Sequence, residues 1–156
     1  MSFGPEHEGS EVTTTDRIVV GIDRSPEAVA ALRWAYEEAR VRGAVLEVVH
    51  AWRLPFAGDP AGLAAEPRSF LGAATHLLSS VVDGELSDHP GVEVVQTLVN
   101  GDPAAALIAK GEGADLVVVG SRGHGGFTGL LLGSVSHKVA DHAPCPVAIV
   151  RPPAAA

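Results

Sequence analysis

Cysteine is nearly absent from the 156-residue chain, since Cys145 is the only one. A single cysteine excludes an intrachain disulfide and a zinc site built from several thiolates. Cys145 lies in the apolar sequence PCPVAIV, which favours a small buried residue over a reactive thiol. The chain also lacks any run near the roughly 18 apolar residues of a membrane span, and residues 1–16 lack the basic start and apolar core of a secretory signal. We therefore expect a cytoplasmic protein with no membrane partner.

Basic residues are scarce as well. Eleven lysines and arginines stand against 19 aspartates and glutamates, for a formal net charge of −8. No stretch gathers the basic residues into a patch that would neutralise several phosphates of a nucleic-acid backbone. Nucleic acid is therefore not expected as a partner.

Aromatic residues make up only 4% of the chain, so a core has to be built from Val, Leu, Ala and Ile. Five apolar, β-branched runs predict strands at 17–23, 44–52, 92–101, 115–121 and 146–151. Helical patterns separate them, at 26–43, about 68–86, 103–113 and about 134–143. This alternation predicts an α/β domain over residues 17–151, with a parallel sheet covered on both faces. Residues 1–16 are predicted to be a disordered tail and residues 152–156 a short C-terminal tail.

Caps support two of these helices. Ser25 and Pro26 are typical of the N-cap and first residue of the first helix, and Gly43 is typical of its end. Asp102 and Pro103 are likewise typical of the N-cap and first residue of the third helix.

A glycine-rich stretch follows the fourth predicted strand. Gly120, Gly123 and Gly133 are spaced as GxxG, nine residues, then GS with Ser134. Glycine lets a backbone approach anionic oxygens closely, and the amides at the start of the last helix favour phosphate. Ser134 and Ser136 would add hydroxyl donors.

Asp23 follows the first predicted strand. If the first and fourth strands are neighbours, Asp23 and the glycine stretch face each other where open α/β sheets bind ligands. Asp23 could alternatively cap the first helix, a role for which Ser25 competes.

Here the sequence resembles a known family. The segment from Val117 to Val150, with GSRGHGGFTGLLLGSVSHKVADHAPCPVAIV, resembles the ATP-binding half of a single-domain universal stress protein. RIVVGIDRSPEAVAALRWA and LEVVHAW resemble the amino half of the same family, so that the resemblance covers Arg17 to Arg151. It implies a doubly wound, five-stranded parallel sheet in the order 3-2-1-4-5 with helices on both faces. It also implies a homodimer formed through the last strand, and a bound adenine nucleotide, ATP with or without Mg²⁺.

The resemblance further implies which residues contact the nucleotide. Asp23 would contact the ribose and phosphate side, and the backbone of Ala51 would meet the adenine edge. The residues expected to hold the phosphates are Gly120, Gly123, Gly133, Ser134 and, through its backbone, Val135. Some ATP-binding members have a basic residue where this chain has His124, and Arg122 would supply the charge instead.

An ATP-binding stress-response or regulatory protein is the expected function. The two lysines, Lys110 and Lys138, lie outside the glycine stretch, so the lysine of a GxxxxGK[ST] phosphate loop is missing, and no catalytic residue is assigned. No protein-built metal site is expected, because His137 and His142 are five residues apart. Three alternatives stay open: slow ATP hydrolysis, a dimeric interaction module of the same fold that binds no nucleotide, and a flavin or dinucleotide binder. The regulatory protein partner, and the choice among ATP, ADP and cyclic AMP, are not specified.

Overall fold

A computed structural model describes residues 15–54, 67–123 and 131–153 of the chain. Strands and helices alternate along these residues in the predicted order: β1 (Arg17–Gly21), α1 (Pro26–Arg42), β2 (Val45–Trp52), α2 (Pro67–Leu86), β3 (Val94–Asn100), α3 (Pro103–Lys110), β4 (Leu116–Gly120), α4 (Ser134–His142) and β5 (Val147–Val150). No helix in these ranges is both long and apolar enough to cross a bilayer. Most of the two predicted tails, residues 1–14 and 154–156, lies outside the described residues.

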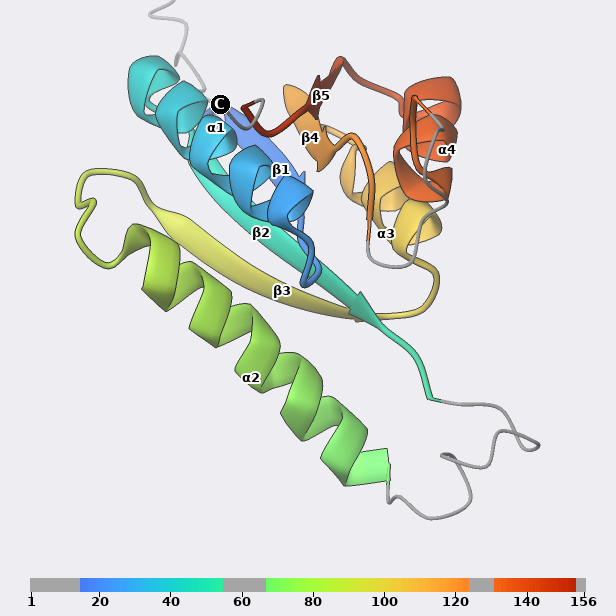
Figure 1. The fold of residues 1–156 in the computed structure, drawn as a ribbon. Coiled ribbons are helices and arrows are strands. Elements are labelled where there is room, and N and C mark those ends of the chain that lie inside the picture. Colours follow the sequence, from blue (N-terminus) through green and yellow to red (C-terminus); the bar gives the residue numbers. More distant parts are fainter. Residues whose placement is uncertain (1–14, 55–66, 124–130, 154–156) are drawn as a thin grey trace, which may run out of the picture.

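The five strands form one parallel sheet in the order β3-β2-β1-β4-β5 (Figure 1), which confirms the predicted fold class. Helices α1 and α2 cover one face, and α3 and α4 cover the other. Strands β1 and β4 are neighbours, with Val19 paired to Val117. Because the strand order reverses between them, their carboxyl ends form the topological switch point at which doubly wound sheets bind ligands.

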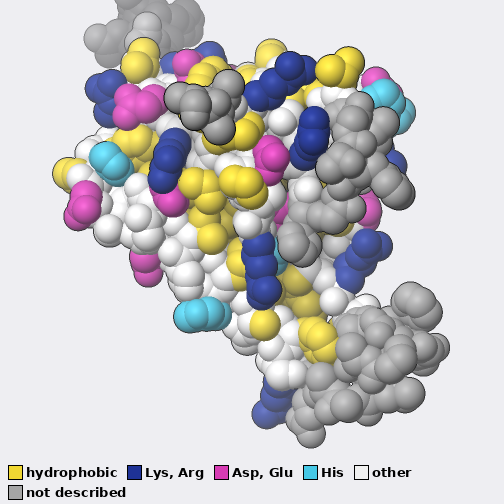
Figure 2. Space-filling view, viewed as in Figure 1, with side chains coloured by type: hydrophobic (Ala, Val, Ile, Leu, Met, Phe, Trp, Pro, Cys, Tyr) yellow, Lys and Arg dark blue, Asp and Glu magenta, His cyan; other side chains and the backbone are white. Residues whose placement is uncertain are grey.

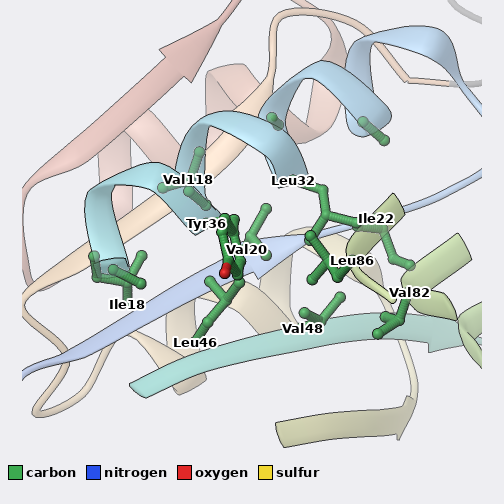
Figure 3. Close-up of a cluster of buried hydrophobic side chains, with 14 of the residues drawn as sticks. Ile18, Val20, Ile22, Leu32, Tyr36, Leu46, Val48, Val82, Leu86 and Val118 are labelled. Carbon is green, nitrogen blue, oxygen red and sulfur yellow. The ribbon is translucent and has the colours of Figure 1, made fainter. Parts of the chain in front are cut away.

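Successive strand residues point to opposite faces, and both faces are buried. Val20 and Val48 pack under α1 and α2, whereas Val19 and Val49 pack under α3 and α4. Figure 3 shows the larger cluster, in which Tyr36 is the aromatic member. The rest of this cluster is aliphatic, as the low aromatic content predicts.

The helix caps follow the sequence prediction. The Ser25 hydroxyl accepts a hydrogen bond from the amide of Ala28, 3.1 Å away, so Ser25 is the N-cap of α1. Gly43 ends α1 with φ of 66°, in the left-handed region, and its amide donates to Ala39. Asp102 caps α3 by accepting from the Ala105 amide at 3.0 Å. The carboxyl end of the sheet is therefore followed by well-anchored helix starts.

Polar groups link β1, β2, β3 and the end of α3. The largely buried Glu47 carboxylate accepts from Arg17 Nη1 at 2.6 Å and Thr97 Oγ1 at 2.8 Å, and lies 2.9 Å from Lys110 Nζ. Burial of the Glu47 carboxyl opposes its ionisation. The three donors and the charge of Lys110 outweigh that effect, so the pKa of Glu47 lies below its ordinary value.

Cys145 is half-buried, less than the buried residue that the sequence predicts. It lies in the turn just before the edge strand β5, where one neighbouring strand is missing. Partial burial raises the pKa of its thiol, with a smaller contribution of the same sign from Asp115. This favours the protonated thiol over the reactive thiolate.

Basic and acidic side chains are dispersed over the face shown in Figure 2, with uncharged groups between them. Among the arginines, Arg33, Arg40 and Arg42 each pair with a glutamate of α1 or α2. These pairs are surface features that contribute little to stability.

Candidate functional site

A cleft of about 700 Å³ opens at the carboxyl ends of β1, β2 and β4. Its walls come from the β1–α1 turn, the end of β2, the start of α3, and the segments on either side of residues 124–130. The cleft brings together all eight residues that the sequence singled out: Asp23, Ala51, Gly120, Arg122, Gly123, Gly133, Ser134 and Val135. His124 lies outside the described residues.

Asp23 and Gly123 both line this cleft and lie close together, since they follow the ends of the neighbouring strands β1 and β4. A Cβ added to Gly123 would lie 3.0 Å from Asp23 Oδ2. The other oxygen, Oδ1, accepts hydrogen bonds from the amide of Ser25, at 2.8 Å, and from its hydroxyl. Asp23 is thus not the cap of α1, since Ser25 has that role, and the amide and hydroxyl of Ser25 hold the carboxylate beside the cleft.

The three spaced glycines permit close approaches within the protein itself. A Cβ at Gly120 would lie 2.8 Å from the carbonyl carbon of Glu27, so glycine lets α1 pass directly over the end of β4. A Cβ at Gly133 would lie 3.2 Å from the Cα of Arg122 and 3.3 Å from the amide nitrogen of Gly123. None of the three has a φ in the left-handed region. Glycine is needed at these positions for space and not for an unusual backbone conformation.

Ser121 and Gly133 join the two ends of the glycine-rich segment. The amide of Gly133 donates to the carbonyl of Ser121 at 2.7 Å. Ser136 was expected to donate to a ligand, but its buried hydroxyl lies 3.0 Å from the same carbonyl and 3.1 Å from that of Gly133. Its single proton is therefore used within the protein.

Helices α1, α3 and α4 all begin at the cleft, which is lined by Ser25, Pro103 and Ser134. Gly133 is the N-cap of α4 and provides no side-chain acceptor for the first-turn amides. Unpaired amides and the helix dipole favour an anion at this position. Arg122, which is half-buried, adds positive charge, and Asp23 is the one acidic side chain among the described lining residues. The α4 side of the cleft is thus suited to a phosphate.

Two parts of the cleft were not found from the sequence. Pro103 and Leu107 of α3 form an apolar wall, which no motif marks because their residue types are those of an ordinary helix. His50 also borders the cleft, and its Nδ1 lies 3.0 Å from the carbonyl of Ile22. Because a carbonyl only accepts, Nδ1 carries the proton and Nε2 is left as an acceptor in the neutral ring.

No group of three or more His, Cys, Asp or Glu side chains suited to a metal occurs within residues 15–54, 67–123 and 131–153. His137, on α4, forms an exposed pair with Asp141 one turn later, at 3.4 Å.

The chain is similar to proteins of one family over most of its length. The profile of the universal stress protein family matches residues 14–151. A universal stress protein of Mycolicibacterium smegmatis is 41% identical over 135 residues, which cover 86% of this chain and 45% of the relative. The chain thus spans about half the length of the curated relatives it matches.

Solved structures give the same result. A universal stress protein crystallised in complex with cAMP is 25% identical, with a TM-score of 0.66 over 86% of this chain and 96% of that one. A universal stress protein from Archaeoglobus fulgidus in complex with dAMP is 29% identical, with a TM-score of 0.61 over the same shares. Fold, motif and relatives agree, and the chain belongs to the universal stress protein family.

Proposed function

We propose that the cleft binds an adenine nucleotide, ATP with or without Mg²⁺, and that the protein acts as a nucleotide-dependent regulator in a stress response. One observation carries this proposal: the eight residues chosen from the sequence for nucleotide contact line a single cleft. The relatives solved with cAMP and dAMP support the adenine class of ligand. Residence in the cytoplasm, where ATP is abundant, belongs to the same proposal.

The β2 side of the cleft would hold the adenine. The backbone of Ala51 is available at the end of β2, and Val49 and Leu107 provide apolar surface beside it. An adenine needs this combination, because its faces are apolar while its edge carries donors and acceptors. Asp23, between this part and the glycines, would contact the ribose hydroxyls.

The α4 side would hold the phosphates. Gly123 and Gly133 leave room for an anion because they carry no side chain, and the amides and hydroxyl at the start of α4 provide donors. The Gly133 amide itself is bonded to the carbonyl of Ser121. Arg122 would supply positive charge. Mg²⁺ is usually held by one or two carboxylates together with substrate phosphates, and Asp23 provides one such carboxylate.

A homodimer formed through β5 is part of the proposal. Strand β5 is at the edge of the sheet, and its four apolar residues, Val147–Val150, are only half-buried. Pairing with a second copy would cover this edge, which otherwise invites uncontrolled association. In this state the bound nucleotide would alter the surface offered to a regulatory partner protein. The same half-buried edge also fits the alternative, a dimeric interaction module that binds no nucleotide.

Calorimetry separates these two functions. Wild-type protein should bind ATP, and Gly123→Val should abolish binding, because the new side chain would enter the space between residue 123 and Asp23 Oδ2. Gly72→Val is the matched control, since Gly72 is exposed on α2 and a Cβ there meets nothing within 4 Å. It should bind ATP as wild type does.

Thermal denaturation gives a second readout. ATP at 100 times its Kd should stabilise the wild type by about 2.7 kcal/mol. A wild type that shows neither binding heat nor a rise in Tm would reject nucleotide binding and favour the interaction module.

A further inference from the structure

Ser136 is among the most deeply buried polar residues of the described chain, with 2% of its surface exposed. Its hydroxyl lies 3.0 Å from the carbonyl oxygen of Ser121 and 3.1 Å from that of Gly133. The second contact is the ordinary bond of a helical serine to the turn before it. The first crosses 15 positions of sequence, and therefore ties the start of α4 to the end of β4.

Ser121 directly follows the last residue of β4, and Gly133 is the N-cap of α4. The Ser121 amide donates to Val150 of β5 at 2.9 Å, and the Ser121 carbonyl receives both the Gly133 amide and the Ser136 hydroxyl. The bond to Val150 thus holds Ser121 to the sheet, and the bond from the Gly133 amide holds Gly133 to Ser121. The hydroxyl of Ser136 contacts the carbonyls of both residues. We call this set of hydrogen bonds among Ser121, Gly133 and Ser136 the closure.

This closure places two of the backbone positions proposed to hold phosphate. Gly133 lies so near Gly123 that a Cβ on Gly133 would be 3.3 Å from the Gly123 amide nitrogen. A small separation of Ser121 from Gly133 would therefore displace the amides of Gly123 and of the first turn of α4 relative to each other. The adenine end of the cleft, at Ala51, is on β2, which β1 separates from β4.

We propose that Ser136 is a positioning residue for phosphate: although Ser136 borders the cleft, its hydroxyl does not donate to the nucleotide but holds the two halves of the phosphate site at their correct separation. This inference rests on the proposed nucleotide-binding function. Its consequence is selective, because the hydroxyl should matter for ligands with a phosphate chain and not for adenosine.

Removal of the hydroxyl should leave the fold intact. In Ser136→Ala the Ser121 carbonyl keeps the Gly133 amide, and the Gly133 carbonyl keeps the amide of His137 at 3.0 Å. Neither carbonyl is left without a partner, so the substitution loosens the closure without creating a buried unpaired group.

The test compares wild type, Ser136→Ala and Ser79→Ala by calorimetry with ATP and with adenosine. Ser79 is the matched control, since its hydroxyl also bonds to the carbonyl three residues earlier, that of His76, but on α2 and away from the cleft. We expect Ser136→Ala to raise the Kd for ATP by about 10-fold, a change of ~1.4 kcal/mol, with the Kd for adenosine unchanged. Ser79→Ala should match wild type with both ligands.

Hydrogen exchange of the Gly133 amide supplies a readout that needs no ligand. Exchange in Ser136→Ala should be faster than in wild type and in Ser79→Ala, while amides of β1 are unchanged. Equal ATP affinity in wild type and Ser136→Ala, or equal weakening of ATP and adenosine, would overturn the inference and leave the proposed function standing. A wild type that binds no nucleotide would overturn both.

Discussion

Replacing Glu47 with glutamine should destabilise the protein at neutral pH and cease to do so in acid. The Glu47 side chain is only 9% exposed and receives three donors, two of them charged. Hydrogen bonds to charged groups contribute about 1.5–3 kcal/mol each where buried. The side chains of Arg17 and Lys110 are 28% and 36% exposed, so water replaces part of the interaction that each loses with Glu47. We therefore expect Glu47→Gln to lower the free energy of unfolding by about 2 kcal/mol.

The pH dependence follows from the lowered pKa of Glu47. The carboxylate stabilises the fold fully above its ordinary pKa of 4.5, and this contribution is lost as the pH falls through the lower pKa of the folded state. Thermal unfolding followed by circular dichroism between pH 7 and pH 3 measures it. At pH 7, Glu47→Gln should lower Tm by roughly 4–8 °C, and the difference from wild type should shrink steadily below pH 4.5.

Glu38→Gln is the control, because Glu38 forms an i,i+4 pair with Arg42 at the surface, which contributes well under 1 kcal/mol. Its Tm should stay within about 2 °C of wild type at every pH. A Tm loss for Glu47→Gln that is the same at pH 7 and pH 3, or no larger than that of Glu38→Gln, would refute the reasoning.

Three further results are expected. Gly120→Ala should destabilise by about 1–3 kcal/mol in urea denaturation, because its Cβ would lie 2.8 Å from the carbonyl carbon of Glu27 and α1 would have to shift; an unchanged midpoint would contradict this packing. Tyr36→Phe should cost about 1 kcal/mol, since the Tyr36 hydroxyl donates to the carbonyl of His89 at 2.6 Å, and a neutral effect would show that water replaces the bond. Light scattering should give twice the chain mass of 16.0 kDa if the edge Val147–Val150 pairs with a second copy, whereas a mass that stays at one chain would reject the dimer.

Most of the fold could be predicted because its signals are local. The Val-rich runs become strands buried on both faces, and Ser25, Gly43 and Asp102 occupy the caps that their chemistry favours. The sheet order came from the family resemblance and not from these local patterns, and the structure confirms it.

Eight of the residues that line the cleft could be predicted, but not how the protein arranges them. The spacing of glycines identified Gly123 and Gly133, yet their near contact with Asp23 and Arg122 depends on how β1, β4 and α4 pack. The inward bond of Ser136 was missed for the same reason, since a serine near a helix start reads equally well as a ligand donor.

An ATP titration of isotope-labelled wild-type protein, followed through its backbone amide resonances, tests the central claim most directly. We expect saturable shifts at one nucleotide per chain, largest for Asp23, Gly123 and Ser134 and small on α2. Absence of shifts at saturating ATP, or shifts concentrated away from the cleft, would contradict it.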